Sequence, residues 1–130
     1  MFRPGNTVGK IGESLATMFL MKQGFKVCGR NYWKKWGEID IIVQKDSKTH
    51  FVEVKSVSCE NIELISLKDN TDYRPEDNLH KRKMSRLARV IETYLQEHAE
   101  IRDWCIDAII VYVDQEQRKS KVRMIENIII

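Results

Sequence analysis

Apolar side chains recur at helical spacing in two stretches of the chain, residues 7–23 and residues 79–98. The first stretch has Val8, Ile11, Leu15, Phe19 and Leu20 on one face, and the second has Met84, Leu87, Ala88, Ile91 and Leu95. Candidate caps and stops are Asn6 or Thr7, Gly24, and Asp77 or Asn78. Two helices are therefore expected, one near the N-terminus and one in the second half of the chain.

Shorter runs of apolar and β-branched residues predict strands at residues 25–31, 38–43, 51–57, 104–113 and 122–130. In the second run, the alternation of Ile39, Ile41 and Val43 indicates one buried face. Turns are expected at residues 33–37 and at Asp46 and Ser47, so that the first three strands form a meander. The polar stretch 58–78 predicts a long loop that could act as a lid.

The resulting order, α-β-β-β-α-β-β, predicts an α/β fold with a mixed sheet flanked by helices. With 130 residues, of which 42% are hydrophobic and 32% charged, the chain has room for a single domain over residues 1–130. It has no apolar run of about 18 residues and no secretory signal pattern, which predicts a cytoplasmic protein without a membrane partner.

Three cysteines at scattered positions predict reduced thiols rather than disulfides or a zinc framework, and the three histidines show no metal-ligand spacing. The net charge of +3 permits a nucleic-acid partner without requiring one.

Acidic residues interrupt two of the predicted strands. Asp40 lies between Ile39 and Ile41, and Glu53 follows Val52, with Lys55 on the same face as Glu53. A hairpin between these strands would bring Asp40 beside Glu53. Two neighbouring carboxylates repel each other unless a cation bridges them, and carboxylate oxygens favour Mg²⁺ or Mn²⁺ over Zn²⁺.

A third acid, Glu13, lies beside the apolar stripe of the first predicted helix, next to small residues, and could reach the same ion. Lys55 could then assist an attacking water. The alternative is a structural ion pair between Lys55 and either Asp40 or Glu53, with Glu13 facing solvent. Glu38, two residues before Asp40, is expected on the same strand face and could orient the metal ligands without binding the metal itself. For Asp107, in an apolar strand, a structural hydrogen-bond acceptor is expected.

Several runs of the sequence together resemble the bacterial YraN-type, endonuclease-like family, of restriction-endonuclease-like fold. The runs are GlyLysIleGlyGlu at 9–13, ArgAsn at 30–31, GlyGluIleAsp at 37–40, PheValGluValLys at 51–55 and AsnLeuHis at 78–80, followed by residues 83–95 and the strand around Asp107. That family is similar to archaeal Holliday-junction resolvases and carries the Asp, Glu-x-Lys nuclease signature. The resemblance implies a metal-dependent nuclease in which Glu13, Asp40, Glu53 and Lys55 are catalytic, with the three acids as metal ligands.

Cations gather in the first half of the second predicted helix, at Lys81, Arg82, Lys83 and Arg86. This order opposes the helix dipole, so a phosphate backbone is a candidate partner, and Lys83 is the preferred contact. The alternative is an ordinary solvated face. A second candidate contact is the TyrTrpLysLysTrp turn, where Trp33 could stack on bases while Lys34 and Lys35 neutralise phosphate. The alternative there is that Trp33 and Trp36 only cap the edge of the core.

The sequence thus favours a Mg²⁺- or Mn²⁺-dependent phosphodiesterase that acts on DNA, either branched or single-stranded. Two alternatives remain open. One is a nucleic-acid-binding module with a vestigial site, and the other is an assembly protein, such as a homodimer, that pairs through its apolar final strand.

Overall fold

The computed structural model describes residues 7–65 and 81–128, with the side chains of residues 81–83 excepted. In chain order the elements are α1 (Thr7–Lys22), β1 (Lys26–Lys34), β2 (Gly37–Lys45), β3 (Lys48–Ser58), η1 (Ile62–Leu64), α3 (Lys81–Glu97), β4 (Trp104–Asp114) and β5 (Lys119–Ile125). This order confirms the predicted fold class. Among the helices described, none is long and apolar enough to cross a membrane.

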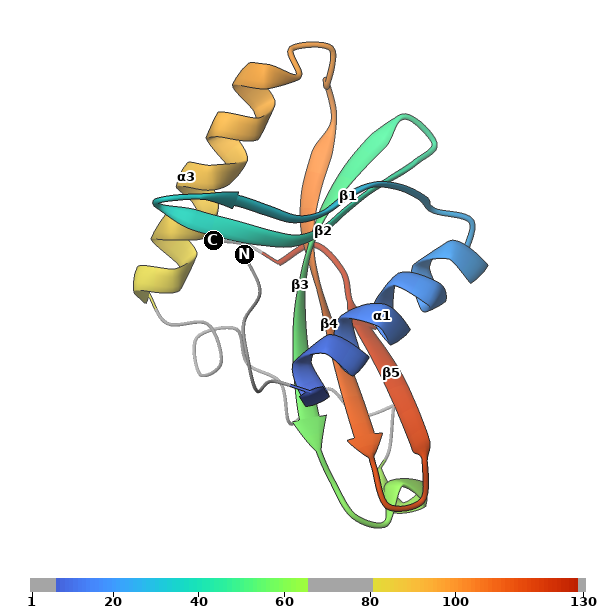
Figure 1. Ribbon diagram of the computed structural model, residues 1–130. Coiled ribbons are helices and arrows are strands. Elements are labelled where there is room, and N and C mark those ends of the chain that lie inside the picture. The colour runs from blue at the N-terminus through green and yellow to red at the C-terminus, as the bar shows by residue number, and fades with distance from the viewer. Residues whose placement is uncertain (1–6, 66–80, 129–130) are drawn as a thin grey trace.

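The five strands form one mixed sheet in the order β1-β2-β3-β4-β5 (Figure 1). Strands β1, β2 and β3 are antiparallel neighbours, which confirms the predicted meander, and β3 and β4 are parallel. Strand β5 returns antiparallel to β4. Because parallel neighbours need a long crossover, the chain passes through α3 between β3 and β4.

Each face of the sheet has its own core, and each core is covered by one helix. Helix α1 packs Ala16 and Leu20 against Val52 and Ile109. On the opposite face, α3 contributes the buried side chains of Leu87, Val90, Ile91 and Tyr94. Ala88 was expected on this apolar face but is exposed, because the buried stripe runs through Val90 and Tyr94 instead. Any residue of β3 therefore faces either α1 or α3.

The strand bounds differ from the predicted ones, mainly because polar residues extend the strands. Strand β1 continues through Lys34, so the turn before β2 occupies residues 35–36 rather than 33–37. The turn at Asp46 and Ser47 is confirmed, with φ values of 51° and 64° that suit a tight hairpin. Most of the predicted loop at 58–78 and the start of the second predicted helix lie outside the described residues.

The final strand is shorter than predicted and ends at Ile125 rather than continuing to residue 130. Beyond it, Ile128 is buried, and its backbone N–H donates to the Ile106 carbonyl oxygen at 2.7 Å. The described part of the C-terminal segment is thus packed against β4, which removes Ile128 from the apolar edge that was expected to pair with another chain.

The predicted alternation of Ile39, Ile41 and Val43 on one face is wrong. Ile39 belongs to the core under α3, whereas Ile41 and Val43 belong to the core under α1. The change of face falls at Asp40, opposite Asn31 of β1, whose left-handed φ of 53° is a conformation that asparagine tolerates. The buried face of β2 therefore changes at the position of the predicted catalytic aspartate.

Candidate metal centre and nucleic-acid interface

Asp40 lies where β2 separates from β3. The β2–β3 ladder ends at the pair Ile41 and Val52, and one further step in the same register would place Asp40 opposite Glu53. At that point the Asp40 side chain replaces the backbone as acceptor, because its Oδ2 accepts the Val54 N–H at 2.8 Å. Since Val54 lies between Glu53 and Lys55, this bond fixes Asp40 against the segment that carries both predicted partners.

Three half-buried carboxylates gather around this point. One carboxylate oxygen from each of Glu13, Glu38 and Asp40 lies within 4.8 Å of the others. Glu13 also faces Arg30, whose Nη2 is 4.0 Å from Glu13 Oε2. The sequence singled out Glu13 and Asp40, and expected Glu38 only in a supporting position. The structure instead makes Glu38 an equal member of the group.

The position of Glu13 depends on close packing between α1 and β3. Gly12, the residue before Glu13, is buried against Ser56. A Cβ atom on Gly12 would lie 1.7 Å from the Ser56 Oγ and 2.8 Å from its Cβ, well below any normal contact. A glycine is therefore required for α1 to approach the sheet and bring Glu13 to the acidic group.

Glu53 occupies the wall of an adjoining cleft of about 400 Å³. Its side chain is 5% exposed and comes from the face of β3 that also carries the buried Phe51. Asp40 and Glu38 line the same cleft, so Asp40 belongs both to this wall and to the group with Glu13. Lys55 is exposed and two residues further along β3, on the face of Glu53. The structure thus brings Asp40 near both Glu13 and Glu53, and the catalytic roles of the four residues stay predictions.

The remaining lining of the cleft is basic and aromatic. It is formed by residues 33–37 of the β1–β2 hairpin and by Arg86 and Leu87 of α3. Gly37 permits this approach, since a Cβ there would lie 2.7 Å from the Arg86 carbonyl oxygen. Four of the predicted nucleic-acid contacts, Trp33, Lys34, Lys35 and Arg86, are therefore next to the acids. The side chains of Lys81, Arg82 and Lys83 lie outside the described part of the chain.

The two tryptophans of the hairpin have different environments. Trp36 packs on the core under α3, its indole N–H donates to Thr93 Oγ1 at 3.2 Å, and the Arg89 guanidinium lies 5.0 Å from its ring centroid. Trp33 is 65% exposed at the rim of the cleft. The core-edge alternative thus holds for Trp36 only, and Trp33 presents an aromatic face to solvent.

Lys34 is partly neutralised by a neighbour. Its Nζ lies 3.4 Å from Glu97 Oε2, and the hydroxyl of Tyr32 donates to the other oxygen of the same carboxylate. Burial, followed by the hydrogen bond to Glu97, raises the pKa of Tyr32 to about 12, so this hydroxyl keeps its proton at neutral pH. Lys35 and Arg86 are therefore better placed than Lys34 to meet a phosphate.

Comparison with known proteins gives one consistent family. The model of the uncharacterised protein family UPF0102 matches residues 12–111. A UPF0102 protein of Campylobacter jejuni is 36% identical over 106 residues, which cover 82% of this chain and 84% of the relative. The UPF0102 protein of Helicobacter hepaticus is 32% identical over 120 residues, which cover 92% of this chain and 92% of the relative. That of Wolinella succinogenes is 33% identical over 120 residues, which cover 92% of this chain and 94% of the relative. The chain thus belongs to UPF0102, the YraN-type endonuclease-like family that its sequence resembles.

Proposed function

We propose that this protein is a Mg²⁺- or Mn²⁺-dependent nuclease that hydrolyses phosphodiester bonds in DNA, with branched or single-stranded DNA as substrate. The observation that supports this most directly is the composition of one cleft. Its lining combines three acids, Glu38, Asp40 and Glu53, with Lys35, Arg86 and an exposed tryptophan. A polyanion and a hard cation would each find complementary groups there.

The donor set fits a hard divalent cation. Glu13, Glu38 and Asp40 offer carboxylate oxygens from two separate elements, and their mutual separation of at most 4.8 Å is within reach of a single ion. The Val54 N–H donates to Asp40 Oδ2, which holds this carboxylate in place beside the other two. When bound, the metal would polarise a phosphoryl oxygen and offset the negative charge of the transition state.

The remaining groups would position the substrate. Lys35 and Arg86 would bind phosphates on either side of the reacting bond, and Trp33 would stack on a base that is not paired. Glu53, nearly buried in the cleft wall, would accept a proton from the attacking water. Lys55 would approach the developing charge from the same strand face. The preference for branched or single-stranded DNA follows from the exposed tryptophan, since duplex bases are already stacked on one another.

Alanine substitutions at the two hairpin tryptophans, Trp33 and Trp36, distinguish a contribution to DNA binding from a contribution to core packing. Trp33→Ala is expected to weaken binding to single-stranded DNA by about tenfold, the effect of one lost base stack, and to leave the melting temperature unchanged. Trp36→Ala is expected to lower the melting temperature, because it removes core packing and the bond to Thr93. Fluorescence anisotropy with labelled oligonucleotides and thermal denaturation measure both. Equal DNA affinity in Trp33→Ala and the unmodified protein would contradict a stacking role.

The nuclease activity itself is tested on duplex, flap and four-way DNA with added Mn²⁺. Cleavage that requires the metal and is greatest on the flap or four-way substrate is expected. A protein that shifts DNA mobility with a steep salt dependence but cuts none of the three substrates would instead be a binding module with a vestigial site.

A further inference from the structure

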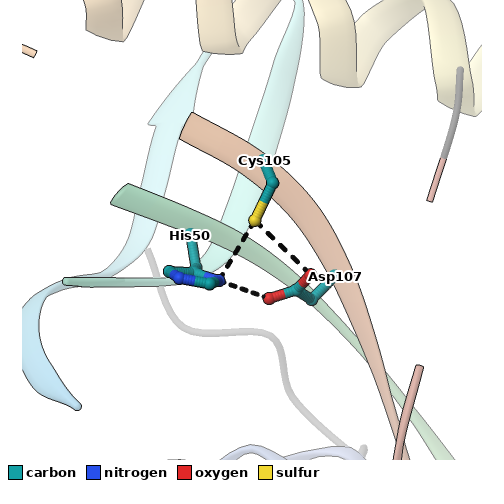
Figure 2. A group of neighbouring side chains, drawn as sticks. All are labelled: His50, Cys105 and Asp107. Atoms are coloured by element: carbon teal, nitrogen blue, oxygen red, sulfur yellow. Dashed lines mark hydrogen bonds and ion pairs between the residues drawn. The ribbon is translucent and has the colours of Figure 1, made fainter. Parts of the chain in front are cut away.

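A second group of metal-ligating side chains lies at the start of β3 and β4, apart from the acidic cleft. His50 is paired with Cys105 in the parallel ladder, and Asp107 follows two residues later on the same face of β4. Figure 2 shows the three side chains pointing toward one another. His50 Nδ1 lies 2.6 Å from Asp107 Oδ2 and 3.1 Å from Cys105 Sγ, and that sulfur lies 3.6 Å from Asp107 Oδ1.

The group is enclosed and held in place by its surroundings. Asp107 is 0% exposed, and the side chain of His50 is 15% exposed. The Asn127 N–H donates to Asp107 Oδ1 at 2.9 Å, which orients the carboxylate so that Oδ2 faces His50. The ring of Phe25 packs edge-on against the imidazole, with the centroids 4.9 Å apart. These contacts fix the imidazole and the carboxylate before any ligand arrives.

The separations are close to those that a tetrahedral metal ion imposes. With metal–ligand distances of about 2.0 to 2.3 Å, neighbouring ligand atoms lie roughly 3.3 to 3.6 Å apart. The sulfur of Cys105 lies 3.1 Å from His50 Nδ1 and 3.6 Å from Asp107 Oδ1, while His50 Nδ1 contacts the other carboxylate oxygen, Oδ2. The 2.6 Å contact between His50 and Asp107 must widen by about 0.7 Å and the 3.1 Å contact between His50 and Cys105 by a few tenths of an ångström, which small side-chain rotations allow.

We propose that His50 Nδ1, Cys105 Sγ and an Asp107 carboxylate oxygen form a binding site for a divalent transition-metal ion of the zinc class. An imidazole and a thiolate suit zinc or cobalt far better than magnesium, which distinguishes this site from the three carboxylates of the cleft. Water completes the coordination and reaches the ion past His50, whose side chain is 15% exposed. The bound ion ties β3 to β4, and through Asp107 it also holds the C-terminal segment.

The site is independent of the proposed nuclease centre. His50 lies on the α1 side of the sheet near the start of β3, whereas Asp40 of the carboxylate group is hydrogen-bonded to Val54, four residues further along the same strand. Glu53 also lies three residues beyond His50 on β3, roughly 10 Å along the strand. A zinc-class ion here therefore acts on the structure, whether or not the cleft cleaves DNA.

Metal binding must displace a proton from Cys105. Burial, and then the charge of Asp107, raise the pKa of this thiol to about 12 without a metal, so at neutral pH the group is a protonated hydrogen-bond donor. The ion takes the place of that proton. One proton is thus released for each ion bound, and the affinity rises with pH.

Cobalt reports the proposed ligands directly. Titration of the full chain with Co²⁺ is expected to give a sulfur-to-cobalt charge-transfer band in the near ultraviolet that corresponds to one sulfur-ligated ion per chain, and added Zn²⁺ is expected to remove the band. Cys105→Ser should abolish it, while Cys59→Ser, a matched change at another half-buried cysteine, should leave it intact. Absence of the band in the unmodified protein, or its persistence in Cys105→Ser, would overturn the proposal.

A second variant keeps the test decisive if Cys105→Ser fails to fold. His50→Gln preserves a polar group in the same space but removes the imidazole ligand, so Co²⁺ affinity should fall by at least about tenfold. Zn²⁺ should also raise the melting temperature of the unmodified protein and of Cys59→Ser, but much less that of His50→Gln. Equal affinity and an equal thermal shift in His50→Gln would show that the three side chains only form a hydrogen-bonded network around Asp107.

Discussion

Asp40→Asn is expected to reduce Mn²⁺-dependent DNA cleavage by about a thousandfold, which corresponds to a barrier increase of about 4 kcal/mol. The amide removes the charge that a hard cation requires but keeps an oxygen that can accept the Val54 N–H. Stability should therefore be unchanged. Single-turnover cleavage of flap or four-way DNA and urea denaturation measure the two quantities separately.

Two comparison variants sharpen the Asp40 experiment. Asp40→Ala also loses the acceptor for the Val54 N–H and should lower the free energy of unfolding by about 1 kcal/mol. Glu116→Gln removes a carboxylate from the exposed β4–β5 turn and should leave both cleavage and stability unaltered. If Asp40→Asn cleaved as fast as Glu116→Gln, the role of Asp40 in the reaction would be refuted.

Gly12→Ala is expected to lower the free energy of unfolding by about 2 kcal/mol, the cost of overpacking an interface that cannot expand. The new methyl group would overlap Ser56, so α1 must move away from β3. Because Glu13 follows directly, cleavage should fall as well. Gly29→Ala is the matched control, since the nearest atom to a Cβ at that position is 4.0 Å away, and urea denaturation should show no loss.

A compensating change tests whether Ser56 is the cause. Ser56→Gly removes both atoms that the new methyl group would strike and leaves only the Cα, at an ordinary 3.7 Å. The Gly12→Ala/Ser56→Gly double variant should therefore be more stable than the sum of the two single changes predicts. Simple additivity of the two effects would exclude the proposed contact between α1 and β3.

The sequence predicted the order of the elements because each one follows a local rule. The apolar stripe of α1 and the hairpin turn at Asp46 and Ser47 depend on neighbours in the chain, and both are found where the pattern places them. The face of β2 depends on tertiary geometry instead. The buried face of β2 changes at Asp40, opposite the left-handed Asn31 of the partner strand, so Ile39 and Ile41 bury on opposite sides although they share parity.

In the candidate sites, too, some features follow from local sequence and others only from tertiary geometry. Asp40 and Glu53 attracted notice because acids rarely interrupt apolar strands, and the hairpin register brings them to one cleft. Glu38 joins Glu13 and Asp40 in one group because α1 packs close to the sheet, and the sequence does not specify that packing. His50 and Cys105 are 55 residues apart and meet only through the parallel pairing of β3 and β4, so no ligand spacing could have indicated them.

Calorimetric titration with Mn²⁺ most directly tests whether these carboxylates bind one metal ion, because the proposed cleavage reaction depends on that ion. We expect the parent protein to bind an ion at the group of Glu13, Glu38 and Asp40, and Glu13→Gln and Asp40→Asn each to weaken that binding by at least about tenfold. Using Cys105→Ser as the background in all three measurements removes the second proposed site from the titration. Heats that are absent throughout, or identical in all three proteins, would contradict a metal centre built from these carboxylates.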